Sequence, residues 1–414
     1  DRMFYKGLGY YIFDKSYLYK KAQFIQKKID SINKSENLLS SIQNNQIIFD
    51  QSNRFFFKKV IEKCKNKKSR LIFIIKNEYL NYNENCKYYI GQKKINPDEN
   101  IFIKTALSLN QNDNKIDFTE NYDLENINGN YYLTKNIIID KNLILPKNKK
   151  LFIKEGIEIF FNEDVSLISE GSMNFEGTKE KPILIYSDKK QGSVILLNNK
   201  YYIDSVVFNN LSFPKNKNQI LYGGVNIVNS DVELINIEIV NSNSEDAINI
   251  ISSSSKIKNI KLKNINSDAI DIDFGNLYFE NISCQNITND CLDVSGASVK
   301  GDKLLSVDVS DKGISFGENS NGLIKNTNFL NNKVGVAVKD GSNLTLVQSK
   351  LENNEYDLAI FNKKEEYGNS TINVKNIFSK DKINVLLGEN NKFLSNQEIK
   401  VKRVKNSFIN GLLY

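Results

Sequence analysis

The chain has 414 residues, of which 40% are hydrophobic and 25% charged, so it can bury a large core and is not intrinsically disordered. It contains no histidine, which excludes Ser-His and Cys-His nucleophile pairs, histidine-ligated zinc and histidine general bases. The formal net charge is +7, and the positive excess falls within residues 1–120. We interpret the densest basic run, residues 63–68, as a solvated helix end, and we predict no nucleic-acid partner.

Residues 1–125 are predicted to form a small, basic α+β module. Apolar residues recur at three- and four-residue steps from Ser16 to about Gln46, which predicts an amphipathic helix, and a second helical stretch is predicted near Arg54–Lys65. The β-branched and aromatic run Leu71–Ile75 predicts a buried strand. No residue type in this module indicates catalysis. No window of the chain approaches the ~20 apolar residues of a membrane span, so we predict no transmembrane segment.

Beyond Asn130 the pattern changes to short alternating apolar runs broken by Asn, Gly, Ser and Asp, and a helical period returns only near the C-terminal end. A five-residue unit of the type Asp-Ala-Ile-Asp-Ile repeats along this region. Its copies begin at Asp246, Asp268, Asp290, Lys312, Val334 and Tyr356, 22 residues apart each time, and an earlier copy begins at Gly223. A repeat of this regularity predicts a solenoid.

A strand alternates the direction of its side chains, so the third and fifth residues of each unit share one side. The fourth residue, which lies between them, points to the other side. The third residues should form one inward stack, made of Ile248, Ile270, Leu292, Ile314, Val336 and Leu358. No coil can bury this face alone, but stacked coils bury a continuous core. We therefore predict an all-β solenoid, a right-handed parallel β-helix with ~22-residue coils. It should span residues 130–385, with residues 386–414 as a C-terminal cap or tail.

The opening coils resemble a known family. The segments Leu151–Gly156 and Gly177–Ile183, the latter a Gly-Thr-x-x-x-Pro-Ile turn that leads into a strand, are similar to bacterial β-helix proteins of the pectin-lyase-like superfamily. The motifs Ser-Asp-Ala-Ile-Asp and Asn-Asp-Cys-Leu-Asp-Val-Ser-Gly also resemble β-helix regions that follow a CotH-type kinase-like domain in some bacterial surface proteins. This second resemblance implies that residues 1–125 are the tail of a larger domain.

Acidic residues gather on one predicted outward face. Asp271 and Asp293 hold the fourth position of two units, and Asp246, Asp268 and Asp290 hold the first position of three. Lys312 holds the first position of the next unit. Like charges ~5 Å apart raise each other's pKa unless a cation intervenes. The pattern is therefore consistent with a divalent cation such as Ca²⁺ held by Asp271 and Asp293, with a shared proton, or with a polyol-binding surface. A structural role, in which stacked Asn and Asp side chains hold the turns, stays open as well.

Short motifs in the same coils resemble polygalacturonase-type glycoside hydrolases. Residues 266–268 (Asn-Ser-Asp) stand for that family's Asn-Thr-Asp, residues 289–291 for Asp-Asp-Cys, residues 311–313 for Gly-His-Gly, and residues 335–339 for the Arg-Ile-Lys strand. The departures fall on working residues, because Asn289 replaces an acid, Lys312 the histidine and Ala337 the arginine. Of the motif residues, the resemblance leaves Asp268, Asp290 and Lys339. For an enzyme, we predict that the catalytic residues are Asp268, Asp271, Asp290 and Asp293, because they are the only clustered acids on a common face and no histidine can replace them. One carboxylic acid would protonate the leaving oxygen and one carboxylate would activate water.

We favour a non-catalytic function. A long solenoid face presents polar groups at a fixed spacing, which suits chain-like ligands, so we predict binding to a polysaccharide or cell-surface glycan. The residues expected to contact it are Asn249, Asp246, Lys312, Glu318 and Lys339. The location predicted is secreted or cell-envelope, although the first residues show no signal-peptide pattern. The alternative is the glycoside hydrolase above. A lyase is disfavoured, because residues 121–402 contain no arginine or histidine that could serve as a strong base.

Four cysteines leave the redox compartment undetermined. Cys284 shares an inward column with Leu262, which predicts a core thiol, and Cys291 follows Ala269 in a column of small residues. A disulfide between Cys284 and Cys291 stays open.

Overall fold

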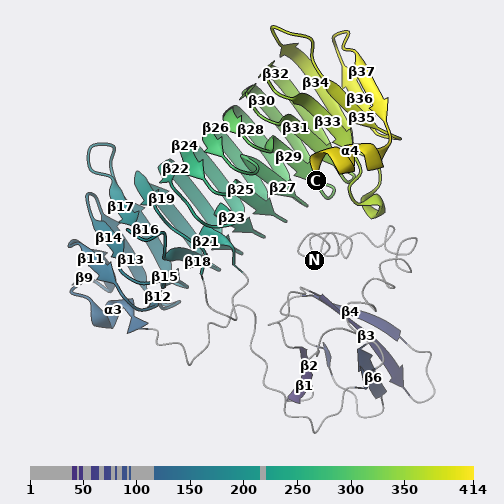
Figure 1. Ribbon diagram of the computed structural model, residues 1–414. Coiled ribbons are helices and arrows are strands. Elements are labelled where there is room, and N and C mark those ends of the chain that lie inside the picture. Colours follow the sequence, from purple (N-terminus) through teal and green to yellow (C-terminus); the bar gives the residue numbers. More distant parts are fainter. Residues whose placement is uncertain are drawn as a thin grey trace. The chain divides into compact units, whose positions relative to one another are not determined.

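The computed structural model describes residues 116–214 and 221–414, together with the backbone of seven short strands between Ser40 and Lys94. The chain divides into two compact units, residues 1–113 with 216–220 and residues 114–215 with 221–414. The second unit is a right-handed parallel β-helix of ~12 turns with ~22 residues per turn (Figure 1). The fold class predicted from the repeat is confirmed.

One side of the β-helix is a 13-stranded sheet, which we name face 1. Its strands are β8 (Ile116–Asp117), β12 (Leu143–Leu145), β15 (Ser166–Ser169), β18 (Ser193–Leu197), β21 (Gly223–Val228), β23 (Asp246–Ile251), β25 (Asp268–Asp273), β27 (Leu292–Ser295), β29 (Lys312–Gly317), β31 (Val334–Lys339), β33 (Tyr356–Phe361), β35 (Val385–Gly388) and β37 (Val401–Val404).

The rest of each turn belongs to a second set of strands. They are β9 (Glu125–Ile127), β10 (Asn130–Leu133), β11 (Ile137–Ile139), β13 (Lys150–Lys154), β14 (Glu158–Phe161), β16 (Ser172–Glu176), β17 (Ile183–Tyr186), β19 (Lys200–Asp204), β20 (Val206–Asn209), β22 (Asp231–Val240), β24 (Ser254–Ile265), β26 (Asn276–Ile287), β28 (Ser298–Val309), β30 (Asn321–Leu330), β32 (Asn343–Glu352), β34 (Thr371–Phe378) and β36 (Lys392–Ser395). In the early turns two strands follow face 1, such as β19 and β20. From β22 onward one bent strand replaces both, because β22 pairs with β19 and with β20. We name the first half of this path face 2 and the second half face 3.

The bends between the faces depend on residues with left-handed backbone. Strand β24 follows Ser252 (φ 49°) and is bent at Asn259 and Asn264, both at φ 57°. Asparagine adopts this conformation more readily than most residues. Its amide also links the turns, because Asn259 Nδ2 donates to Asn236 Oδ1 and Asn264 Nδ2 donates to Asn241 Oδ1, each at 3.1 Å. The richness in asparagine thus follows from the geometry of the bends.

The inward stack predicted from the third positions is confirmed. Successive strands of face 1 pair Ile248 with Ile270, Ile270 with Leu292, and onward to Leu358, always 22 residues apart. All six residues belong to one buried core cluster. The same register joins Ile257 to Phe279 on face 2. Each turn therefore buries its aliphatic side only against its neighbours in the stack.

The N-terminal strands correct one prediction and confirm another. Strand β3 (Phe57–Cys64) occupies the stretch near Arg54–Lys65 where a helix was predicted, so that prediction is wrong. It pairs on both edges, with β4 (Arg70–Ile75) and β6 (Cys86–Ile90), and this pairing outweighs the helix preference of its Lys and Glu residues. Strand β4 confirms the strand predicted at Leu71–Ile75.

The helix predicted from Ser16 lies outside the described residues up to residue 39. Its predicted end is instead β1 (Ser40–Gln43), which pairs with β2 (Gln46–Phe49), and β2 pairs with β5 (Leu80–Asn81). Strand β7 (Lys93–Lys94) joins the edge of β6.

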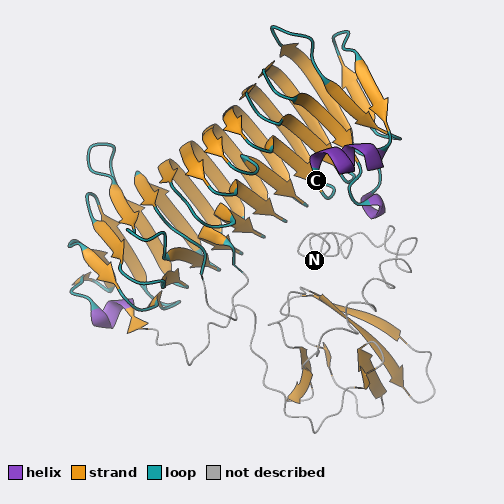
Figure 2. Cartoon of the chain, in the orientation of Figure 1, coloured by secondary structure: helices purple, strands orange, loops and turns teal. Residues whose placement is uncertain are grey.

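Two α-helices are described, near the two ends of the β-helix (Figure 2). Helix α3 (Phe118–Asn121) inserts the fully buried Phe118 into the core cluster. Helix α4 (Asn406–Leu413) confirms the helical period near the C-terminal end, and it packs on the outward side of face 1 against Ala337 and Ala359. A single 3₁₀ turn, η1 (Glu365–Tyr367), lies between β33 and β34. Within the described part of the chain, no helix has the length and apolar character needed to cross a membrane.

Glycine makes room for aromatic rings of the core. Gly301 lies opposite Phe279 in the register of face 2, and a Cβ atom at Gly301 would fall 2.0 Å from Phe279 Cζ. Phe279 is fully buried, so its ring has no free space to move into. A ring of this size fits one turn only because the next turn has no side chain there.

We expect Gly301→Ala to destabilise the β-helix by about 1–3 kcal/mol, because the new methyl group overlaps the Phe279 ring. Thermal and urea unfolding followed by circular dichroism measure the loss. The matched control is Gly411→Ala in α4, where a Cβ meets nothing within 4 Å and where alanine should be neutral or stabilise by up to about 1 kcal/mol. Adding Phe279→Leu to Gly301→Ala should recover part of the loss, and a double variant no more stable than the single one would contradict this explanation.

Candidate functional site

The acidic residues predicted as a site lie in consecutive turns of face 1. Asp271 pairs in register with Asn249 on one side and with Asp293 on the other, so the predicted one-turn spacing is present. Their environment differs from the expected outward surface. Asp246 is 0% exposed, Asp268 8% and Asp290 3%, so these residues are buried.

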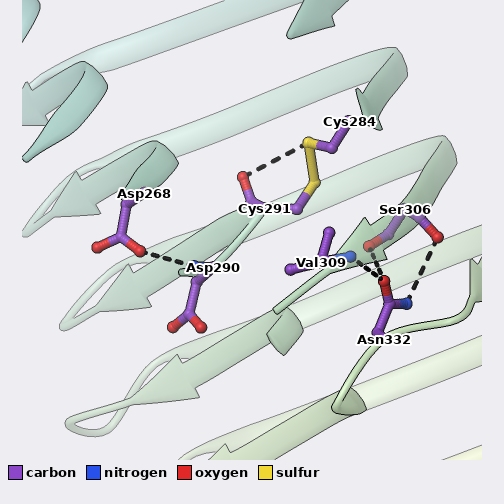
Figure 3. Close-up of a disulfide and its surroundings, with 7 residues drawn as sticks. All are labelled: Asp268, Cys284, Asp290, Cys291, Ser306, Val309 and Asn332. Carbon is purple, nitrogen blue, oxygen red and sulfur yellow. Dashed lines mark hydrogen bonds between the residues drawn. A yellow bond between two sulfur atoms is a disulfide. The ribbon is translucent and has the colours of Figure 1, made fainter. Parts of the chain in front are cut away.

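Two of these carboxylates bind the backbone of the following turn. Asp268 Oδ1 accepts the N–H of Asp290 at 2.8 Å (Figure 3). It also accepts the side-chain amide of Asn289 at 2.7 Å. Asp290 Oδ1 accepts the N–H of Lys312 at 3.0 Å and lies 3.4 Å from Lys312 Nζ. Lys312 Nζ also donates to Asp311. The structural role left open by the sequence is therefore present at these two positions.

The same contacts set unusual protonation equilibria. Burial, together with the nearby charges of Asp290 and Asp293, raises the pKa of Asp268 well above its usual range. Burial also raises the pKa of Asp290 to about 6, against the opposing effect of Lys312. Two adjacent carboxyl groups of this kind can hold a proton near neutral pH, which an acid/base pair requires.

The other predicted binding residues surround this ladder. Asn249 Nδ2 donates to Asp246 Oδ2 at 2.6 Å. Lys339 is 4% exposed, and its ammonium donates to Ser315 Oγ at 2.8 Å. Glu318 lies on the bend after β29 and forms a buried ion pair with Lys364. All five predicted binding residues are thus buried.

Tyr414 is a neighbour of this site that the sequence did not indicate. Lys339 Nζ donates to Tyr414 Oη at 3.0 Å, and Lys312 Nζ and Lys363 Nζ lie 4.8 Å and 3.4 Å from the centre of its ring. Tyr414 is 75 residues from Lys339 in the chain and follows α4, outside the repeat. No repeat pattern could have placed it there.

The structure decides the cysteine question. Cys284, at the end of β26, and Cys291, before β27, form a disulfide inside the core, where both are 0% exposed (Figure 3). The core thiol predicted at Cys284 is therefore a disulfide sulfur. The inward columns bring the two Cα atoms to 5.9 Å, within the range that a disulfide spans.

Across the described residues, no group of three or more Asp, Glu or Cys side chains is arranged to hold a metal ion. The Ca²⁺ site at Asp271 and Asp293 stays a prediction.

A polar groove of ≈ 590 Å³ crosses the bend between face 1 and face 2. Its lining comes from four consecutive turns and consists of Asn198, Asn199, Lys200, Asn229, Ser230, Asp231, Ser252, Ser253, Ser254, Phe274, Gly275 and Asn276. The Asn-Ser pair at residues 229–230 and the Ser-Ser pair at residues 252–253, 23 residues apart, are its signal in the sequence.

Two exposed tyrosines extend the groove onto face 2. Tyr202 follows Lys200 on the same side of β19, and Tyr278 follows Asn276 on the same side of β26. Their side chains are 39% and 48% exposed. Strand pairing connects them through one residue each of β22 and β24, so they are three strands, or ~14 Å, apart.

No protein-family model matches this chain, and no curated protein matches its sequence. Among solved structures it is similar to an alginate lyase from Paenibacillus sp. str. FPU-7, with 11% identity over 64% of this chain and 100% of that chain and a TM-score of 0.37. It is also similar to the periplasmic alginate epimerase AlgG, with 12% identity, coverages of 70% and 83%, and a TM-score of 0.33. A third is the catalytic domain of a GH87 α-1,3-glucanase, with 12% identity, coverages of 80% and 77%, and a TM-score of 0.37.

These likenesses concern the fold alone. The right-handed β-helix that the resemblance to the pectin-lyase-like superfamily implied is confirmed by the strand register described above. The resemblances to polygalacturonases and to regions that follow CotH-type domains stay predictions.

We expect Asp290→Ala to destabilise the protein by about 3 kcal/mol, because it leaves the buried Lys312 ammonium and backbone N–H without their shared acceptor. Chemical unfolding near neutral pH measures the change. The matched control is Glu280→Ala, which removes a surface ion pair with Lys258 and should cost less than about 1 kcal/mol. Equal effects of the two substitutions would show that the Asp290 contact contributes nothing special to the fold.

Proposed function

We propose that this protein binds a polysaccharide along the outside of its β-helix without cleaving it. The observation that carries the proposal is the polar groove at the bend between faces 1 and 2, with Tyr202 and Tyr278 exposed beside it. The contacts expected from the sequence at Asp246, Lys312 and Lys339 would need buried side chains to open, so we place the glycan at the groove instead.

The groove offers the chemistry that a neutral sugar chain needs. Asparagine amides both donate and accept hydrogen bonds, serine hydroxyls do the same, and Lys200 and Asp231 add one donor group and one acceptor group. A tyrosine ring presents an apolar face to the C–H side of a sugar while its hydroxyl stays in water. Because these groups recur at the strand spacing of ~4.8 Å, they suit a ligand that is itself a repeating chain.

The buried disulfide supports a location outside the cytoplasm. Structural disulfides form and persist mainly in oxidising compartments such as the periplasm and the extracellular space. The pairing of Cys284 with Cys291 in the core therefore favours the secreted or cell-envelope location predicted from the sequence.

We expect Tyr278→Ala and Tyr202→Ala each to weaken binding to the preferred glycan roughly tenfold, since each removes one stacking surface. A glycan array identifies the ligand, and affinity electrophoresis or calorimetry then measures the dissociation constants. The control is Phe378→Ala, which removes a 60% exposed aromatic ring from β34, away from the groove. The proposal fails if no glycan binds, or if the Phe378 variant loses as much affinity as the tyrosine variants.

A second candidate is a glycoside hydrolase, favoured by one observation. Asp268 and Asp290 are adjacent carboxyl groups, both with raised pKa values, and an acid/base pair needs one member protonated and one ionised at the working pH. Against it, both are less than 10% exposed and already accept backbone N–H groups.

For this second candidate we expect reducing-end release from a panel of uronate and neutral glycans, measured with and without calcium. Asp290→Asn should abolish release while keeping an acceptor for the N–H of Lys312, so loss of activity can be separated from loss of fold by circular dichroism. Absence of release from every glycan, or release unchanged in the Asp290 variant, would remove the hydrolase and leave binding alone.

A further inference from the structure

Three lysine side chains gather around the ring of Tyr414, on the outward side of face 1. Lys312 comes from β29, Lys339 from the end of β31, and Lys363 from the segment that follows β33. Their ammonium nitrogens lie 4.8, 5.6 and 3.4 Å from the ring centre, in that order. Such a concentration of positive charge needs compensation.

Only part of this charge is neutralised. Lys312 is paired with Asp290 and Asp311, and the neighbouring Lys364 is paired with Glu318. Lys339 donates to two neutral hydroxyl groups, Ser315 Oγ and Tyr414 Oη. No carboxylate of the described residues lies within 4.0 Å of its ammonium, but against the effect of burial the nearby Tyr414, Asp293 and Asp290 raise its pKa.

Lys363 is in a similar position. Among the described residues, the contact of its ammonium is the face of the Tyr414 ring. Its backbone is fixed, because the N–H groups of Lys363 and Lys364 both donate to Asp340 Oδ1, at 2.7 and 2.6 Å. Among the described residues, Lys363 thus meets the tyrosine without a carboxylate in ion-pair contact, whereas the buried Lys339 has Asp293 and Asp290 nearby.

The donors of this cluster are available to a ligand. Lys339 is 4% exposed, so its ammonium orients the Tyr414 hydroxyl from inside the cluster and does not itself face solvent. Tyr414 Oη accepts from Lys339, so its own O–H can donate to another group. Tyr414 is 55% exposed and Lys363 is partly exposed, so the cluster can be reached from solvent.

We propose that Lys363 and the hydroxyl of Tyr414, which the buried Lys339 holds in place, form a binding site for a carboxylate or sulfate group. The site lies on the outward side of face 1 and is separate from the polar groove, so it does not rest on the proposed function. The anion comes either as a free ion or as an acidic group on a polysaccharide.

The pH dependence of binding follows from the charges that face Lys363. Burial, and then Lys339, Lys312 and Lys364, lower the pKa of Lys363 to about 8, while Asp340 acts in the opposite direction. Lys363 is therefore charged below pH 8 and becomes neutral as the pH rises through 8. Anion binding should be present near neutral pH and weaken at higher pH, whereas the pKa of Lys339 is raised well above its usual range and it stays charged.

The test titrates sodium sulfate and sodium acetate into the full chain by calorimetry, at constant ionic strength set with chloride. We expect affinity to fall at least tenfold between about pH 7 and about pH 9.5, because Lys363 is neutral at the higher value. Lys363→Gln should bind weakly at both pH values. Lys363→Arg should bind at both, since arginine stays charged. Lys375→Gln, at an exposed lysine of β34, is the matched control and should behave as the unmodified chain does.

Further titrations with an oligouronate and a sulfated oligosaccharide distinguish the two sources of the anion. Tighter binding than acetate or sulfate alone, lost in Lys363→Gln, assigns the site to an acidic glycan, while no gain over the free ions assigns it to a free anion. The proposal is overturned if no anion binds, if Lys363→Gln binds as well as the control, or if binding of the unmodified chain does not change with pH. Binding of a neutral glycan at the groove should be the same in all these variants, so the two proposals fail separately.

Discussion

Every turn of this β-helix must set its backbone donors and acceptors opposite those of the turn before, because a strand inside the stack has no other partner for them. From β23 to β33 the turns keep a constant length of 22 residues under this constraint, and the bends fall at the same points in successive turns. The left-handed asparagines follow from it, since Asn259 and Asn264 occur where the path must turn and bind the asparagines of the turn before. The pairing of Phe279 with Gly301 follows as well, because in-register neighbours must share the same core volume.

The same register brings like charges together, and the protein uses them in its structure. Carboxylates in neighbouring turns are ~5 Å apart, a distance at which they repel strongly when buried. Asp268 and Asp290 relieve this by accepting backbone N–H groups of the next turn, and Lys312 ends the acidic series with a buried ammonium. Proton transfer and the structural hydrogen bonds would therefore use the same carboxylate oxygens, and a carboxylate that orients a turn is less free to transfer a proton. This competition is the physical reason for placing ligand binding elsewhere.

The two proposed binding surfaces, the polar groove and the cluster around Tyr414, differ in the chemical groups that they offer to a ligand. The groove at the bend between faces 1 and 2 is rich in amides and hydroxyls and is flanked by exposed rings, which suits an uncharged polyol. The cluster around Tyr414 is cationic and is held by backbone contacts to Asp340. The first is built from residues that repeat along the solenoid, whereas the second depends on α4 folding back over the last turns. A ligand with both neutral and acidic sugars would meet each chemistry at a different place.

The sequence by itself determined the turn length, the inward columns and the spacing of the acidic residues. Each of these depends on the two-residue alternation of a strand and on the 22-residue repeat of the amino-acid sequence. It did not determine what covers the outward side. Ala337 and Ala359 are buried by α4, and Tyr414 reaches Lys339 from 75 residues away, contacts that no repeat encodes. The strand β3 was missed because pairing on both edges overrides the local preference of its lysines, and the disulfide was undecided because only the bend brings Cys284 to Cys291. Local periodicity specifies a repeating interior, but contacts between segments outside the repeat are decided by the tertiary structure.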